Sequence, residues 1–377
     1  MRSDPEKILR RTMARFVDQE VIPRAREMDE KAVFPREMFK KLAEMGCFSI
    51  RYPRQAGGGG GNTTLFCIMC EELARGYMSL AAITAMQCLM GTNFLFHYGT
   101  DELKKKYFYP AMDGEMVASF ALTEPEAATD LSNVRTLAEK TPDGWLINGM
   151  KTWITNAPVA DFFTVLCQTQ RGSGLKGLNF FFIPRTTPGV STSKKFDKLG
   201  TRATEISELA FKDVLIPHHH LLGQEGQGMR NLFSILAVIR IMTAALAVGL
   251  ARAAYAASVK YSNERQQFGR TIGKFQLIQS KIANMATQIW ASHLMTYEAA
   301  RLVDSGQPAT KESSMAKYFA TETACMCADE ATRIFGSYAY SMEYDVQRFY
   351  RDNRFLLYGG GTHEILQTNI SRECGVY

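Results

Sequence analysis

The chain has 377 residues, of which 46% are hydrophobic and 22% are charged, with a formal net charge of +6. This composition argues against extended disorder and is typical of a globular protein with a large core. So mild a positive charge does not require a nucleic-acid partner, and we expect none; it suits an enzyme whose ligands carry phosphates.

The first zone, residues 1–115, has helical periodicity. Apolar residues recur at three- and four-residue spacing over 8–21 and 35–45, which predicts amphipathic helices. The glycine run 57–61 marks a loop between them. It is not a phosphate-binding loop of the P-loop type, because no Lys-Ser or Lys-Thr pair follows it.

The second zone, residues 116–225, changes to short apolar runs bounded by Gly, Pro, Asp and Asn. The runs 116–122, 145–148, 162–168 and 178–183 predict strands of an antiparallel sheet or small barrel. The third zone, residues 226–377, returns to helix over 239–264, 280–304 and 310–336. This order predicts a mainly α protein with an inserted β domain.

Neither a membrane span nor a metal site is expected. The first residues lack the apolar region of a signal peptide, and no run of 18 or more apolar residues occurs, so we expect a cytoplasmic protein. The eight cysteines lie in apolar surroundings, which favours buried, reduced thiols. Cys67 and Cys70 have CxxC spacing but no second pair, and the adjacent residues 218–220, all His, project in different directions.

Seven motifs follow one another at a characteristic spacing. They are Phe120-Ala-Leu-Thr-Glu-Pro-Glu-Ala-Ala-Thr-Asp130, Lys151-Thr-Trp-Ile-Thr-Asn156, Lys198-Leu-Gly-Thr-Arg202, Asn263-Glu-Arg-Gln-Gln-Phe-Gly269, Phe275-Gln-Leu-Ile-Gln279, Arg351-Asp-Asn353 and Gly361-Thr-His-Glu-Ile365. In this order they closely resemble the acyl-CoA dehydrogenase family, and the resemblance covers essentially the whole chain. It implies a helical N-terminal domain, a middle β domain and a C-terminal four-helix bundle.

The resemblance also implies ligands and partners. The cofactor would be FAD, the substrate an acyl-CoA thioester, the redox partner an electron-transferring flavoprotein and the assembly a homotetramer. Residues that match cofactor positions of the family are Phe120, Thr123, Thr129, Trp153, Thr155, Arg265, Phe268, Gln276, Thr362 and Glu364. Aromatic rings, hydroxyls and arginine suit the flat ring, the polar edge and the pyrophosphate of a flavin dinucleotide. Arg333 departs from the family pattern, and it either pairs with a phosphate or crowds the cofactor.

The catalytic base of the family has no equivalent here. The register places Gly360 where most members have a glutamate, and Ile239 where a minority have one; neither can take a proton. The backbone N–H of Gly360 would still hold the thioester oxygen, an interaction typically worth ~3 kcal/mol. Of the neighbouring residues, Glu364 is a poor substitute base, and His363 is a better candidate whose position usually faces away.

We therefore predict a divergent dehydrogenase for a cyclic or already unsaturated acyl group, working by a 1,4-type elimination with a displaced base. Members that act on alicyclic CoA esters are similar in lacking the α-base. The base would come from the segment 84–90, where Cys88 and Thr84 are weak candidates. Further residues expected to bind the substrate are Arg240, Gln87, Tyr358 and Gly361. The alternatives are a conventional dehydrogenase or enoyl-CoA reductase with an unrecognised base, and a redox-inactive homologue that binds FAD and CoA.

Overall fold

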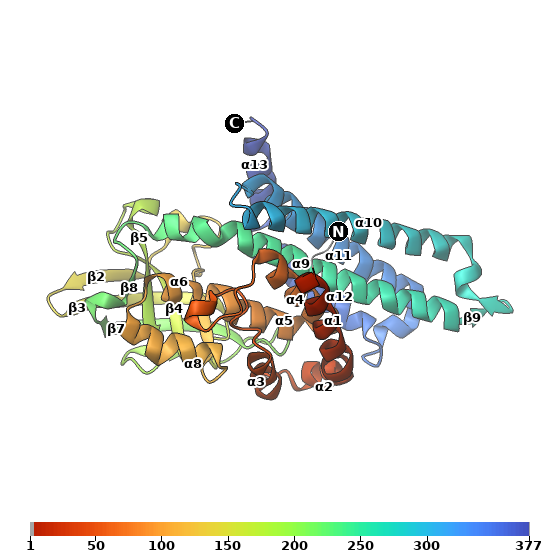
Figure 1. The fold of residues 1–377 in the computed structure, drawn as a ribbon, viewed down its shortest axis with the longest axis horizontal. Helices are drawn as coiled ribbons and strands as arrows, with labels where there is room; N and C mark the ends of the chain where they lie inside the picture. Colours follow the sequence, from red (N-terminus) through yellow and green to blue (C-terminus); the bar gives the residue numbers. More distant parts are fainter. Residues whose placement is uncertain (1–3, 377) are drawn as a thin grey trace.

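The computed structural model describes residues 4–376, and its first region is helical (Figure 1). The helices are α1 (Asp4–Phe16), α2 (Ile22–Lys31), α3 (Arg36–Glu44), α4 (Thr63–Gly76), α5 (Met78–Ala85), α6 (Asn93–Tyr98), α7 (Asp101–Leu103) and α8 (Tyr109–Met112). Asn62 caps α4, because its side chain accepts a hydrogen bond from the backbone N–H of Leu65. The helices predicted at 8–21 and 35–45 are confirmed; a π-helical turn, Val17–Val21, continues α1.

The middle region is a single eight-stranded sheet. Its strands are β1 (Ala118–Ala121), β2 (Leu137–Thr141), β3 (Gly144–Thr155), β4 (Phe162–Gln168), β5 (Leu178–Pro184), β6 (Val190–Thr192), β7 (Ile206–Ile216) and β8 (Leu221–Leu222). They lie in the order β6-β7-β3-β2-β4-β5-β8, with β1 beside β4. Most neighbours are antiparallel as predicted, but β1 and β2 both run parallel to β4. The long connections that lead from β1 and β2 to β4 permit this direction.

The third region is a set of long helices. They are α9 (Gly228–Glu264), α10 (Gln276–Asp304), α11 (Thr310–Phe335), α12 (Val346–Asp352) and α13 (His363–Glu373), with a hairpin of β9 (Gln266–Gln267) and β10 (Arg270–Thr271) between α9 and α10. Helix α9 packs against α4, α10 and α11, and α13 packs against α11. Figure 1 shows α9 running from the sheet to the hairpin at the opposite end.

One face of the sheet shares a core with the helices, and the other face covers a smaller core of its own. Phe180 and Phe182 of β5 point into the large core that also contains the helices, whereas Phe181 and Ile183 point into a smaller core on the other face of the sheet. This alternation is the two-residue period of a strand. We keep 1–115, 116–225 and 226–377 as a proposed domain division, since α8 ends at Met112 and α9 begins at Gly228.

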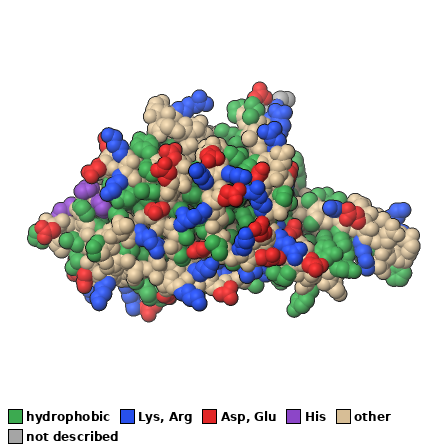
Figure 2. All heavy atoms as spheres, turned by 90° about the horizontal axis from the view of Figure 1, so that it is seen from below, with side chains coloured by type: hydrophobic (Ala, Val, Ile, Leu, Met, Phe, Trp, Pro, Cys, Tyr) green, Lys and Arg blue, Asp and Glu red, His purple; other side chains and the backbone are tan. Residues whose placement is uncertain are grey.

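Two helical stretches are long and apolar enough to cross a membrane by composition alone, Met78–Tyr98 and Gly228–Glu264. Within the protein, 83% and 78% of their most apolar windows are buried. Burial of this extent is what the core helix of a soluble protein shows. Figure 2 shows Lys and Arg side chains interspersed with Asp and Glu over the face that it presents.

Candidate active site

A glycine loop between a short 3-10 helix, Asn353–Leu357, and α13 packs against α9. Gly360 has φ +74° and Gly361 has φ +106°, a region of backbone space that favours glycine. A Cβ atom at Gly360 would lie 3.1 Å from Thr243 Oγ1 and 3.5 Å from Ile239 Cγ2. The two positions at which the family resemblance would place a base therefore face each other, and neither carries an acid.

The backbone N–H of Gly360 donates no hydrogen bond to any residue that the structure describes. The nearby Thr243 hydroxyl donates to the carbonyl oxygen of Ile239 at 2.8 Å and is satisfied within α9. The free N–H of Gly360 is thus a donor available to an acceptor such as a thioester oxygen.

Arg240 is a buried cation beside this loop. It is 6% exposed, its Nη1 donates to Ser314 Oγ at 3.1 Å, and its Nε has no hydrogen-bond partner. No carboxylate among the described residues forms an ion pair with it. Burial lowers the pKa of Arg240, because the guanidinium has lost water without gaining a counter-charge.

Lys317 of α11 is a second buried cation, 0% exposed. Its Nζ donates to the carbonyl oxygens of Gly361, at 2.6 Å, and of Leu357, at 3.3 Å. Burial and then the charge of Arg240 lower the pKa of Lys317 to about 8. It holds the glycine loop against α11, and no described carboxylate forms an ion pair with it.

The sequence did not single out Lys317. Its position carried a signal, since it lies on the buried, small-residue stripe of α11 with Ser313, Ala320 and Ala324. A charged residue on such a stripe has to be satisfied by the backbone or by a ligand.

The three residues predicted in the segment 84–90 are engaged elsewhere. Thr84 Oγ1 donates to the carbonyl oxygen of Leu80, and the Gln87 side chain bonds to the backbone of residues 111, 116 and 118. The Cys88 thiol is buried, donates to the carbonyl oxygen of Cys47, and has a pKa well above its ordinary value because of burial. These contacts do not support Thr84 or Cys88 as a base, or Gln87 as a substrate ligand.

His363 also turns away from the loop. Its Nδ1 lies 2.8 Å from Glu322 Oε1 and its Nε2 lies 2.8 Å from Thr321 Oγ1, both on α11. Glu364 is solvent-exposed in the first turn of α13, and hydrogen bonds from its own backbone N–H and from the Thr362 hydroxyl lower its pKa. Tyr358 is exposed at the other end of the loop. None of these residues replaces the missing carboxylate at Gly360.

A β-bulge sets the orientation of Trp153. The register of β3 against β7 shifts between Lys151 and Ile154, and Trp153 has φ +59°. As a result the indole is 62% exposed, steadied by the ring of Phe196 at 4.9 Å between centroids. An exposed, fixed indole provides the flat apolar wall that a flavin ring needs.

Three threonines in the motifs around the sheet have hydroxyl groups without a partner. Those of Thr123, Thr129 and Thr155 make no hydrogen bond within the described part of the chain, so they are free to bond a ligand. A buried ion pair connects the two motifs that carry these threonines, because Lys151 Nζ lies 2.7 Å from Glu124 Oε1. Both residues belong to the motifs that carry the family resemblance, but the sequence alone indicates no role for the pair.

Phe120 lies differently from the prediction that it presents a surface to the flavin. It is 8% exposed, and its ring stacks on Phe94 and Phe180 at 5.9 and 5.5 Å between centroids. Phe94 and Phe180 therefore hold the ring of Phe120 within the core that the sheet shares with the helices.

The remaining cofactor candidates lie around the hairpin, at the end of the molecule opposite the sheet (Figure 1). Phe268 is 91% exposed and Gln276 is exposed at the start of α10. The Arg265 guanidinium lies 5.4 Å from the ring centroid of Tyr338. Arg333 pairs with Asp329 at 2.6 Å on the surface of α11. Within one chain these residues do not join Trp153.

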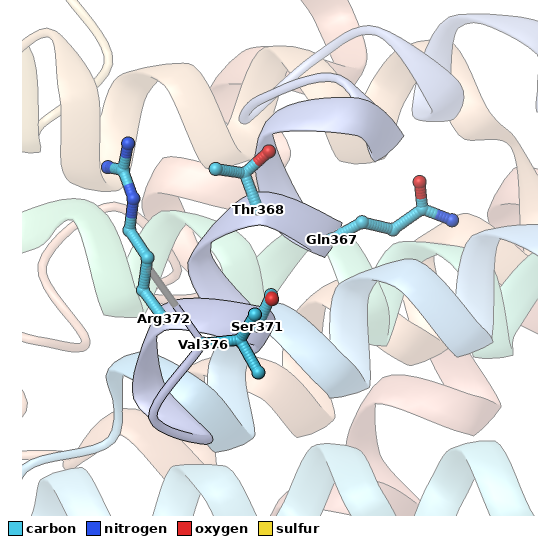
Figure 3. Close-up of a pocket in the computed structure, with 5 residues that line it drawn as sticks. All are labelled: Gln367, Thr368, Ser371, Arg372 and Val376. Atoms are coloured by element: carbon cyan, nitrogen blue, oxygen red, sulfur yellow. The ribbon is translucent and has the colours of Figure 1, made fainter.

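A surface pocket of ≈ 410 Å³ lies along α13. Gln367, Thr368, Ser371, Arg372 and Val376 line it, and Figure 3 shows that Gln367 and Arg372 diverge from the helix. It contains none of the predicted site residues. Among the described residues no group of three or more His, Cys, Asp or Glu side chains is arranged for a metal ion.

Comparison with known proteins covers the chain from end to end. Residues 3–115, 119–214 and 226–375 match the N-terminal, middle and C-terminal domain models of acyl-CoA dehydrogenase. Benzylmalonyl-CoA dehydrogenase of Aromatoleum aromaticum is 45% identical over 98% of both chains, and 3-(aryl)acrylate reductase of Clostridium sporogenes is 39% identical over 98% of both. The structure of butyryl-CoA dehydrogenase from Megasphaera elsdenii matches with a TM-score of 0.95 at 33% identity, over 99% of each chain. The chain is therefore an oxidoreductase of the FAD-dependent acyl-CoA dehydrogenase family.

Proposed function

We propose that this enzyme dehydrogenates a CoA thioester that carries an aryl or other ring, without a protein base at the α-carbon. The observation that carries the proposal is the contact of Gly360 with Ile239, because both positions for a base meet there without an acid. The names of two relatives, benzylmalonyl-CoA dehydrogenase and 3-(aryl)acrylate reductase, support an aryl group.

Residues of this chain supply binding and orientation. The N–H of Gly360 holds the thioester oxygen, and the Lys317 ammonium fixes the loop that presents it. Trp153, with the hydroxyls of Thr123, Thr129 and Thr155, holds the FAD ring system, while Thr362 and Glu364 lie at the loop edge. Bound FAD accepts the hydride from the acyl chain.

The exposed hairpin supports an assembly of several subunits. Arg265, Phe268 and Gln276, with Arg333 nearby, reach the FAD of a neighbouring subunit in a homotetramer. The exposure of Phe268, at 91%, supports this, because its ring is free to contact a neighbouring subunit. An electron-transferring flavoprotein reoxidises the enzyme, in a cytoplasmic setting.

The test is flavin absorbance under anaerobic conditions during addition of thioesters. We expect bleaching by a ring-bearing ester that needs no α-proton removal, either a cyclohexenyl-CoA ester by 1,4-type elimination or an arylmethylmalonyl-CoA ester. Butyryl-CoA, a straight-chain saturated ester, should leave the flavin oxidised. Ready bleaching by butyryl-CoA would overturn the proposal, since it requires a conventional base.

The reverse reaction is the second candidate, and the name of the arylacrylate reductase favours it. Reduction of an arylacryloyl-CoA would deliver hydride to the β-carbon and would then need a proton at the α-carbon. The same site lacks an acid for that proton. Oxidation of reduced enzyme by cinnamoyl-CoA, followed at the flavin band, measures this direction.

A further inference from the structure

Two motifs of the sequence have no role in the proposed function, and they contact each other. One is 198–202, in the loop between β6 and β7, and the other is 351–353, at the end of α12. The Asp352 carboxylate is 1% exposed and accepts a hydrogen bond from the backbone N–H of Thr201 at 2.6 Å. Hydrogen bonds to an ionised acceptor are the strong ones, so this bond fixes the loop on the helix. We call the contact of the two motifs the junction.

Close packing and further bonds reinforce the junction. A Cβ atom at Gly200 would lie 2.4 Å from the carbonyl oxygen of Arg351, so a larger residue would force the two segments apart. The Arg351 guanidinium donates to the carbonyl oxygen of Leu199 at 3.1 Å and pairs with Asp29 of α2 at 2.6 Å. The junction therefore joins the N-terminal helices, the sheet region and α12.

Both sides of the junction continue directly into the active site. On the sheet side, the same loop carries Phe196, whose ring steadies the indole of Trp153, the flavin wall, at 4.9 Å between centroids. On the helix side, α12 is followed without a break by the 3-10 helix Asn353–Leu357 and then by the loop that presents the N–H of Gly360. The junction thus connects the flavin wall to the donor for the thioester oxygen.

We infer that Asp352 is a positioning residue for the reaction, whose bond to Thr201 sets the place of the Gly360 N–H relative to the flavin. The inference rests on the proposed function, in which this N–H holds the thioester oxygen. Lys317 ties the same loop to α11, and the junction ties it to the segment beside the flavin wall. Such placement matters, because a misplacement of ~1 Å in an active site can lower a rate ~100-fold.

The hold on the thioester oxygen can be measured with the FAD-loaded enzyme and two ligands that do not react. Phenylacetyl-CoA has no hydrogen on its β-carbon, and its thioether analogue, S-(2-phenylethyl)-CoA, has no carbonyl group. We expect the wild-type enzyme to bind the thioester ~5-fold tighter or more by titration calorimetry, because one net hydrogen bond has an effect of this size. Equal affinities would overturn the inference together with the role of Gly360 in the proposed function.

Variants of Asp352 assign this preference to the junction. Asp352→Ala removes the acceptor for the Thr201 N–H, and we expect the two affinities to become equal while FAD stays bound. Asp352→Asn keeps an amide oxygen as the acceptor and should retain the preference, a rescue that a general loss of structure would not show. A preference that survives in Asp352→Ala would overturn the inference and leave the proposed function standing.

The matched control is Asp304→Ala. The Asp304 carboxylate also accepts backbone N–H groups of another segment, those of Thr63 at 2.7 Å and Thr64 at 3.0 Å, but it joins the end of α10 to the start of α4. We expect this variant to keep the preference for the thioester. Loss of the preference here as well would show that the effect is not specific to the junction, and the inference would fall.

The wild-type enzyme gives a further test that does not depend on a variant. Burial raises the pKa of Asp352 to about 6. Protonation makes this carboxyl a weaker acceptor, so the preference for the thioester should shrink as the pH falls below 6, whereas in Asp352→Asn it should not. The phosphates of CoA also titrate, but they are common to both ligands and cancel in the ratio of affinities. The charged and titratable groups around the junction are Asp29, Tyr77, Lys198, Arg202, Arg348 and Arg351. A wild-type preference that is equal above and below pH 6 would overturn the inference.

Discussion

Helix α9 carries two arginines with opposite surroundings, the half-buried Arg252 and the buried Arg240. Arg252 lies with Arg10 against Glu71 and Glu72, which are each 1% exposed, and Tyr297 donates a further hydrogen bond to Glu71. Arg240, roughly 18 Å earlier along the helix, has no acid beside it. At the first place the fold supplies its own counter-charge, and at the second no described carboxylate forms an ion pair with the arginine.

We call Arg10, Arg252, Glu71 and Glu72 the first cluster, and Arg240 with Lys317 the second cluster. The largest expected effect comes from adding an acid to the second cluster. Ile239→Glu would place a carboxylate against the glycine loop, beside Arg240. We expect flavin reduction by butyryl-CoA to rise ~10²- to 10⁴-fold, the usual contribution of a positioned general base. Rapid-mixing absorbance measures it, and Ile239→Gln controls for shape. No gain over the glutamine variant would mean that this position does not reach the α-proton.

Removing an acid from the first cluster should damage folding instead. Glu71→Gln leaves Glu72 as the only carboxylate opposite Arg10 and Arg252. Breaking a buried ion pair lowers the free energy of unfolding by ~3–5 kcal/mol. Chemical denaturation measures the free energy of unfolding. The control is Glu298→Gln, which removes an exposed pair with Arg301 and should change that free energy by ~0–1 kcal/mol. A loss for Glu71→Gln no larger than that of the control would remove the contrast between the clusters.

The contrast also shows what the sequence could predict. The sequence predicts the order of helices and strands and the motifs around Trp153 and Gly360, because periodicity and turn residues are local features. The partners of Arg240 were not, since an ion pair depends on which distant residues the fold brings together. The sequence likewise placed Phe120 at the surface of the site, whereas stacking with Phe94 and Phe180 is set by long-range packing.

Protonation of Lys317 should make the affinity for an anionic ligand depend on pH. Lys317 has a pKa of about 8, below its ordinary 10.5, so it is charged only below about pH 8 in the free enzyme. The groups around it are Arg240 of α9, Glu322 of its own helix, and His363 and Glu364 of α13. An anionic ligand favours the charged form, so affinity should be constant below pH 8 and fall above it.

The slope of that loss is set by one proton. Affinity for phenylmalonyl-CoA should fall by up to ~10-fold per pH unit above pH 8, which calorimetry at several pH values measures. Phenylacetyl-CoA, without the carboxylate, is the control and should change less. A parallel decline for both esters would locate the titrating group away from the carboxylate.

The smallest expected effect is on stability at Arg240. In Arg240→Met the guanidinium and its desolvation penalty both disappear, and only one hydrogen bond, to Ser314, is lost. Replacing an unbalanced buried charge by an apolar side chain of similar length is neutral or stabilising. We therefore expect the free energy of unfolding to stay within ~1 kcal/mol of wild type or to rise, the opposite of Glu71→Gln. A loss as large as that of Glu71→Gln would show that Arg240 is held by a partner in the folded chain, and the second cluster would then be structural like the first.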